Sequence, residues 1–272
     1  MQIPNDYNQQ EINLHRAAQL ISLTGVNLQN HLPDDSHTTM VWNTEAKLLL
    51  GRSFELNNKR YCVGIRLYPF ELALFDENLS AVQAIEIGGI DKPALYSIWE
   101  DWLRNMGFKG ELINKVHYEL PQTPGYHAMR LQGLENEFAD AWSNLRSLAN
   151  NVMESLNIVS GTESEVNIWP HHFDTGVYYP IATQNDETIQ SIGAGLAIAD
   201  SMIREPYFYI YGWTKEGVIE YKNAPKLEAG QWLTKEWQGA VLKASDITDQ
   251  KQVSHFLKQA FDFLKAELVK NN

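Results

Sequence analysis

The clearest structural signal in the chain is LQGLENEFADAWSNLRSLANNVMESL, residues 131–156. Apolar side chains recur in it at intervals of three or four residues, which is the spacing of one face of an α-helix. The stretch therefore predicts a long amphipathic helix whose apolar face packs on another layer. These apolar positions are Leu131, Leu134, Phe138, Trp142, Leu145, Leu148, Val152 and Leu156.

Outward from this helix, the two halves of the chain have similar patterns. PQTPG at residues 121–125 is rich in turn formers and predicts a boundary between residues 1–125 and 126–272. In the first half, a helix is expected at 9–30 and alternating strands at 46–87, with a turn at Asn57–Asn58. A second helix starts near Asp91 and stops at Gly107.

The second half continues with a meander of strands over residues 165–221, interrupted by a partly helical segment at 185–203. A closing helix is expected at 248–268, where apolar residues again share one side. The predicted fold class is thus α+β, with two similar lobes, each an antiparallel sheet meander packed against helices. One continuous domain made of these lobes is the alternative.

Composition limits the classes of function. The chain has 272 residues, of which 44% are hydrophobic and 21% charged, as expected of a globular protein. Its 34 acidic and 22 basic residues give a net charge of −12, which disfavours binding to nucleic acid. With Cys62 as the only cysteine, an intrachain disulfide is impossible. Residues 1–10 lack a secretory signal pattern and no apolar run reaches about 20 residues, so we expect a cytoplasmic location and no membrane partner.

Reactive side chains gather in NIWPHHFD, residues 167–174. In an extended strand alternate side chains share a face, so His172 and Asp174 are expected to point together. A carboxylate next to an imidazole can fix its tautomer and raise its basicity, which makes these two the candidate catalytic pair. The same pair, completed by Glu205, is a candidate site for a divalent metal.

A second aromatic stretch, REPYFYIY, follows at residues 204–211. Strand alternation places its three tyrosines on one face, where they could stack on a sugar or a nucleobase, meet a partner, or pack in a core. The candidate ligand-binding residues are Trp169, His171, Glu205, Tyr207, Tyr209, Tyr211 and Trp213.

These residues favour binding of a small polar or aromatic ligand at the His/Asp/Tyr/Trp cluster. Two alternatives stay open: a structural or interaction module in which the cluster is core, and a metal-assisted or His–Asp hydrolase. Gly193-Ala-Gly195 lacks the third glycine of a dinucleotide loop, and a P-loop pattern is missing, so no nucleotide cofactor is expected. The remaining histidines, His15 among them, are expected at the surface or at caps. Apolar helix faces leave a homodimer open.

Three segments together resemble a known family: SIWEDWLRNMG at 97–107, WPHHFD at 169–174 and EPYFYIY at 205–211. The chain resembles a mostly bacterial family described only as a domain of unknown function, over roughly residues 40–215. The resemblance implies the architecture and the location of a site around Phe173–Asp174 and Glu205–Pro206. It implies no particular chemistry.

Overall fold

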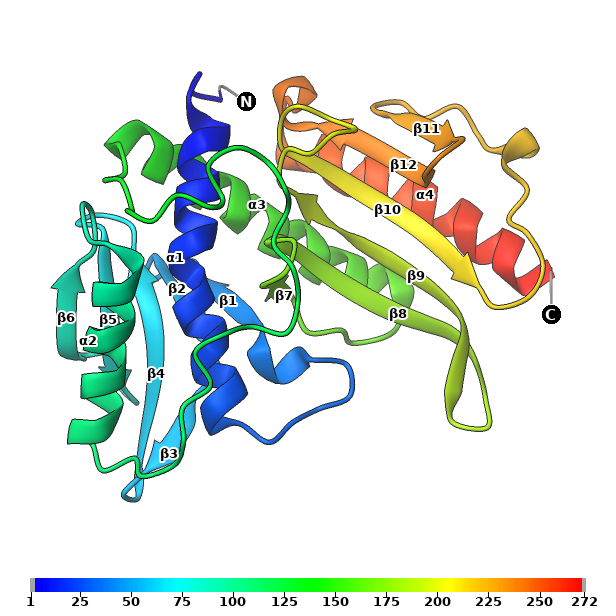
Figure 1. The fold of residues 1–272 in the computed structure, drawn as a ribbon. Helices are drawn as coiled ribbons and strands as arrows, with labels where there is room; N and C mark the ends of the chain where they lie inside the picture. The colour runs from blue at the N-terminus through cyan, green and yellow to red at the C-terminus, as the bar shows by residue number, and fades with distance from the viewer. Residues whose placement is uncertain (1–2, 271–272) are drawn as a thin grey trace. The chain divides into compact units, whose positions relative to one another are not determined.

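The computed structural model describes residues 3–270 and has an α+β fold with antiparallel strand pairing. Figure 1 shows the elements along the chain, with a block of strands after α1 and a second block after α3. The α+β class predicted from the sequence is confirmed. Within residues 3–270, no helix is long and apolar enough to cross a membrane.

The described residues divide into two compact units. The N-terminal unit contains Pro4–Asn144 and Asn167–Phe173. The C-terminal unit contains Ile3, Leu145–Val166 and residues 174–270. The chain therefore changes unit within a helix and again on both sides of a short strand, so these units differ from the predicted lobes 1–125 and 126–272.

The sheet of the N-terminal unit has the order β7-β1-β2-β4-β5-β6, with β3 paired to β4. The predicted meander is present, and its turn at Asn57–Asn58 has left-handed backbone at both residues (φ 53° and 59°), which suits a tight hairpin. The strands are β1 (Met40–Asn43), β2 (Leu48–Gly51), β3 (Phe54–Leu56), β4 (Lys59–Arg66), β5 (Glu71–Asp76), β6 (Ala81–Glu86) and β7 (Asn167–Trp169).

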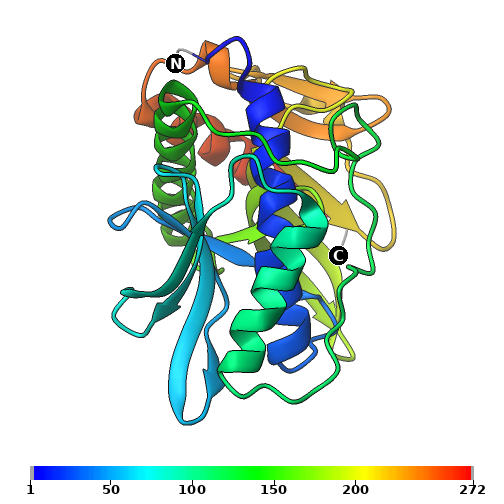
Figure 2. The ribbon, with the colours of Figure 1, turned by 60° about the vertical axis from the view of Figure 1, so that its left-hand side comes forward.

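Helix α1 (Tyr7–Leu28) packs on β2 and β4 of this sheet. The packing is close, because a β-carbon at Gly51 would lie 2.4 Å from Cγ2 of Ile21. Helix α2 (Lys92–Asn105) lies beside α1, as Figure 2 shows. The buried indole of Trp99 joins the two helices by donating a hydrogen bond to Oγ1 of Thr24 (2.9 Å).

The segment 106–135 explains why the unit continues past residue 125. Throughout this segment, all of which the structure describes, no α-helix or β-strand forms. Its polar groups bind α1 instead: Asn13 exchanges two hydrogen bonds with the backbone of Gln132 (2.7 and 2.9 Å), and the Tyr118 hydroxyl donates to Oε1 of Gln19 (2.6 Å). The PQTPG stretch is therefore a loop inside the unit, not a linker between domains.

The sheet of the C-terminal unit has the order β8-β9-β10-β12-β11. Strand β9 occupies most of the segment 185–203, for which a partly helical structure was predicted, so that prediction is wrong. Asn185 and Asp186 take left-handed conformations (φ 52° and 62°) and close a two-residue hairpin between β8 and β9. The strands are β8 (Asp174–Gln184), β9 (Glu187–Ala197), β10 (Tyr207–Thr214), β11 (Gln231–Thr234) and β12 (Gln238–Lys243).

Helix α4 (Gln250–Lys270) and the C-terminal part of α3 (Asn136–Ser160) cover one face of this sheet. Phe261 of α4 packs edge-on against Tyr179 of β8, with ring centroids 5.6 Å apart. On the α3 side, Asn157 accepts a hydrogen bond from the Tyr179 hydroxyl (2.8 Å). The apolar periodicity of both predicted helices therefore corresponds to a real buried face.

Candidate functional site

The segment Pro170–Phe173 forms a turn at the end of β7, not an extended strand. The amide of Phe173 donates to the carbonyl of Trp169 (2.7 Å), and Phe173 has a left-handed backbone (φ 58°). The alternation expected of a strand does not apply here, so it no longer supports a common face for His172 and Asp174, which stays a prediction.

A buried histidine on α1 holds this turn in place. Nε2 of His15 donates to the carbonyl of Pro170 (2.7 Å), and the Tyr126 hydroxyl lies 2.9 Å from Nδ1. The Phe173 ring stacks on the imidazole with centroids 4.7 Å apart. The expectation that His15 lies at the surface or at a cap is thus wrong. The sequence did contain a signal that His15 is buried, namely its position among the apolar residues of the first helix.

The two units divide the predicted site residues between them. Trp169, His171 and His172 belong to the N-terminal unit. His172 is exposed, and its ring lies 4.6 Å from that of His171, which in turn lies 6.2 Å from Trp169. The C-terminal unit contains the others, namely Asp174, Glu205, Tyr207, Tyr209, Tyr211 and Trp213.

Within the C-terminal unit, β10 brings the aromatic residues together. A β-carbon at Gly212 would contact Ile219 and, on α4, Leu264, so the side of β10 that carries Gly212 faces the helix. The residues that alternate with it project from the opposite face of the sheet, as predicted. We call this opposite face, with Tyr207, Tyr209, Tyr211 and Trp213 of β10 and with Asp174 and Tyr178 of β8, the aromatic face.

Glycines in β9 let two of these tyrosines lie across the sheet. A β-carbon at Gly193 would be 2.5 Å from Cε1 of Tyr211, and one at Gly195 would be 2.7 Å from the Tyr209 hydroxyl. Any larger residue would displace the rings. The two rings are nearly parallel (28°), with centroids 6.2 Å apart. The sheet therefore presents a flat pair of phenol rings, each half-buried.

The carboxylate of Asp174 closes one side of this pair. Its Oδ2 accepts a hydrogen bond from the Tyr209 hydroxyl, which reaches over β9 from β10. Burial, followed by the charge of Asp174, raises the pKa of Tyr209 well above its usual value of 10. The same two causes raise the pKa of Tyr211. Both phenols are therefore neutral hydrogen-bond donors at physiological pH.

Two further acidic residues near this face have structural contacts. The Tyr207 hydroxyl donates to Oδ2 of Asp200 (2.7 Å), whose Oδ1 accepts from the amides of the turn that follows. Oε2 of Glu205 accepts from the amide of Ser245 (2.9 Å). These contacts fix the loops that flank β10.

The predicted metal ligands come from both units, with His172 in the N-terminal unit and Asp174 and Glu205 in the C-terminal unit. Across the residues that the structure describes, no three His, Cys, Asp or Glu side chains are placed so that they could hold a metal ion. Asp174 and Glu205 instead accept the hydrogen bonds from Tyr209 and Ser245 described above. A metal at His172, Asp174 and Glu205 stays a prediction.

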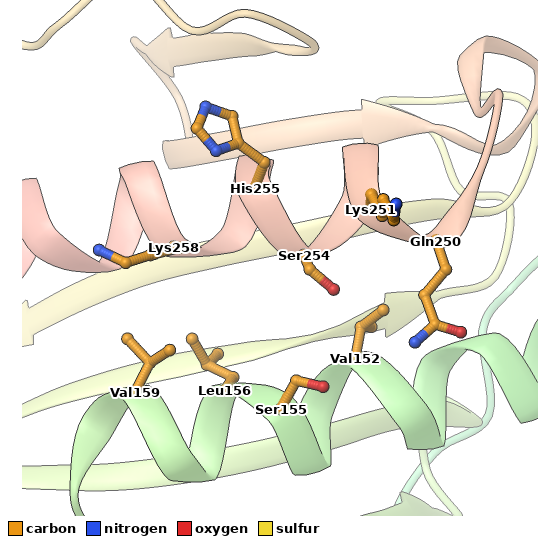
Figure 3. Close-up of a pocket in the computed structure, with 9 residues that line it drawn as sticks. All are labelled: Val152, Ser155, Leu156, Val159, Gln250, Lys251, Ser254, His255 and Lys258. Atoms are coloured by element: carbon orange, nitrogen blue, oxygen red, sulfur yellow. The ribbon is translucent and has the colours of Figure 1, made fainter.

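A groove of about 480 Å³ lies between α3 and α4 on the other side of the C-terminal unit, and Figure 3 shows the side chains that line it. The apolar part of its wall comes from α3 and the basic part from α4. No motif in the sequence pointed to this groove, because its residues are spaced over two distant helices. The lining residues are Val152, Ser155, Leu156, Val159, Gln250, Lys251, Ser254, His255 and Lys258.

Comparison of the chain with protein-family models, with curated proteins and with solved structures finds no match. The resemblance to a domain of unknown function, drawn from three short segments, therefore stays a prediction.

Proposed function

We propose that this protein binds a sugar-like polar ligand on the aromatic face of its C-terminal unit. The observation that carries the proposal is the pair of phenol rings of Tyr209 and Tyr211, which lie across glycines with the carboxylate of Asp174 beside them. The proposal is limited to binding. The group that donates a hydrogen bond to Asp174 is the neutral phenol of Tyr209, and this pair does not indicate catalysis.

The chemistry of this face suits a ring that has one apolar side and a polar edge. Flat aromatic rings stack against the C–H face of a sugar, while a carboxylate and phenol hydroxyls bind its hydroxyl groups. Trp213 (43% exposed) and Tyr178 (44% exposed) extend the face beyond the tyrosine pair. Exposed apolar side chains that gather in one patch can mark a ligand-binding surface.

Alanine variants of the half-buried Tyr211 and the exposed Trp213 test the proposal. Calorimetric titration of the full chain with a panel of mono- and oligosaccharides should identify a binder, and Tyr211→Ala and Trp213→Ala should each weaken it by about tenfold, the effect of losing about 1.4 kcal/mol of stacking. Tyr68→Ala is the matched control, because Tyr68 is 69% exposed but lies in the N-terminal unit.

The proposal fails if no sugar in the panel binds, or if the two variants bind as tightly as the Tyr68→Ala control. A parallel titration with nucleosides separates the second ligand class that stacked tyrosines could serve. If nucleosides bind while the sugars do not, and Tyr211→Ala loses nucleoside binding, the site on the aromatic face is kept and its ligand class becomes nucleosides.

A further inference from the structure

The carboxylate of Asp174 on the aromatic face lacks a cationic partner. Its Oδ2 accepts the hydrogen bond from the Tyr209 hydroxyl, a neutral phenol. Its Oδ1 accepts no hydrogen bond from the described residues, and they do not enclose this oxygen, since Asp174 is only half-buried. Among the same residues, no Lys, Arg or His nitrogen lies within 4.0 Å of the carboxylate. Asp174 therefore offers a ligand one free oxygen and an uncompensated negative charge.

Glycines keep the sheet next to this carboxylate clear of large side chains. In the sheet register, Gly176 of β8 lies opposite Gly195 of β9. The ring of Tyr209 lies across Gly195, and the ring of Tyr211 lies across Gly193. The free carboxylate oxygen and the two phenol rings thus belong to one stretch of surface, which a single ligand can cover.

The aromatic rings add to the attraction for a cation. The face of an aromatic ring is negative and attracts a cation within about 6 Å of its centre. In the part of the chain that the structure describes, no Lys or Arg lies over the rings of Tyr209 or Tyr211. A third ring, that of Trp237, has its centroid 6.2 Å from that of Tyr211 and lies over Gly239 of β12.

The charged residues around Tyr207 also leave Asp174 uncompensated. Burial and Asp200, followed by the charge of Asp174, raise the pKa of Tyr207, so the field of Asp174 extends along the face. Lys243 of β12 lies opposite Tyr207, but β9 and β10 separate β12 from β8, which carries Asp174. A ligand can supply the positive charge that the chain does not place here.

We propose that the ligand of the aromatic face carries a protonated amine, as an amino sugar does, and that this amine binds Oδ1 of Asp174 while the sugar ring lies on Tyr209 and Tyr211. The inference rests on the proposed sugar-binding function and narrows its ligand to cationic sugars. A hydrogen bond between an ammonium group and a carboxylate is stronger than one made by a neutral hydroxyl. The nearby ring faces add a cation–π attraction that a neutral sugar lacks.

Three trisaccharides that differ only in the group at C2 test the inference by calorimetric titration of the full chain at pH 6, where the sugar amine is protonated. They are the trimers of glucosamine, of N-acetylglucosamine and of glucose. We expect the glucosamine trimer to bind about tenfold more tightly than the other two. Equal or tighter binding of a neutral trimer would overturn the inference and leave the sugar-binding function standing. If no sugar binds at all, both proposals fail.

Variants separate the charge of Asp174 from the net charge of the chain. Asp174→Asn keeps an oxygen that can accept from Tyr209, so it should weaken binding of the glucosamine trimer about tenfold and leave binding of the glucose trimer unchanged. Glu154→Gln, which removes one exposed charge from α3 in the same unit, is the matched control and should change neither affinity. Equal effects of the two variants, or equal loss of both trimers in Asp174→Asn, would overturn the inference.

Discussion

Phe173 adopts a backbone conformation that bulky residues rarely take, yet its ring is fully buried. Tertiary contacts compensate for this unfavourable backbone conformation. The Phe173 ring stacks on His15 and on Trp142, and the ring centroids of Phe173 and Trp142 are 5.9 Å apart. A pattern of alternating residues cannot reveal such a turn, since the partner that stabilises it lies more than 150 positions earlier in the chain. This is why the sequence located the reactive residues of 167–174 but predicted a strand where the chain forms a turn.

At Tyr209 the raised pKa leads to a prediction about alkaline pH. The folded chain holds the phenol proton more tightly than the unfolded chain, so this contribution to stability is complete below pH 10 and is lost as pH rises above it. At neutral pH, Tyr209→Phe should lower the free energy of unfolding by about 1–2 kcal/mol, because the hydrogen bond to Asp174 is lost. Above pH 10, the difference between wild type and variant should shrink by up to about 1.4 kcal/mol per pH unit.

Urea unfolding of both proteins at pH 8, 10 and 11 measures this difference, and the other tyrosines cancel because both chains contain them. A difference that stays constant from pH 8 to pH 11 would contradict the prediction, since it would mean that the Tyr209 phenol ionises alike in the folded and unfolded chains.

Among the elements, helices with a continuous apolar stripe were predictable to within a few residues. The closing helix was predicted at 248–268 and runs over Gln250–Lys270. The long helix begins later than its apolar pattern, because the backbone of Leu131 pairs with Gly89 and Ile90.

Strand β9 was missed since Gly193, Ala194 and Gly195 have low strand propensity. A β-carbon at Gly193 or Gly195 would collide with the ring of Tyr211 or Tyr209, so these two positions need glycine.

The β8–β9 hairpin offers a direct test at this scale. Both loop residues, Asn185 and Asp186, have left-handed backbones, and Asn-Gly is the preferred pair for such a two-residue loop. Asp186→Gly should therefore stabilise the protein by about 0.5–1 kcal/mol, which raises Tm by about 1–4 °C. Asp186→Ala, which keeps the strain without the tolerance of aspartate, is the control and should lower Tm. A Tm for Asp186→Gly at or below that of the wild type would refute the assignment of this turn.

At the scale of the molecule, contacts made after residue 125 complete the N-terminal unit. Tyr126 and Trp142 reach the buried polar groups of α1: the Tyr126 hydroxyl lies 2.9 Å from Nδ1 of His15, and the Trp142 indole donates to Oε1 of Glu11 (3.1 Å). The loop-like composition of PQTPG indicated a boundary, but composition alone does not distinguish a linker from a loop that crosses a helix. The internal similarity of the two predicted lobes stays a prediction.

The division into units predicts how fragments of the chain behave. A fragment of residues 1–125 ends before Tyr126, Phe138, Trp142 and Phe173, so it would leave the aromatic and polar groups of α1 without the side chains that bury them. We expect this fragment to lack cooperative urea unfolding and dispersed amide signals in NMR. A fragment of residues 1–173 includes every described residue of the N-terminal unit and should show both. Cooperative unfolding of the 1–125 fragment at the urea midpoint of the longer one would instead restore the boundary that the sequence predicts, because it would show that the residues after 125 add nothing to this core.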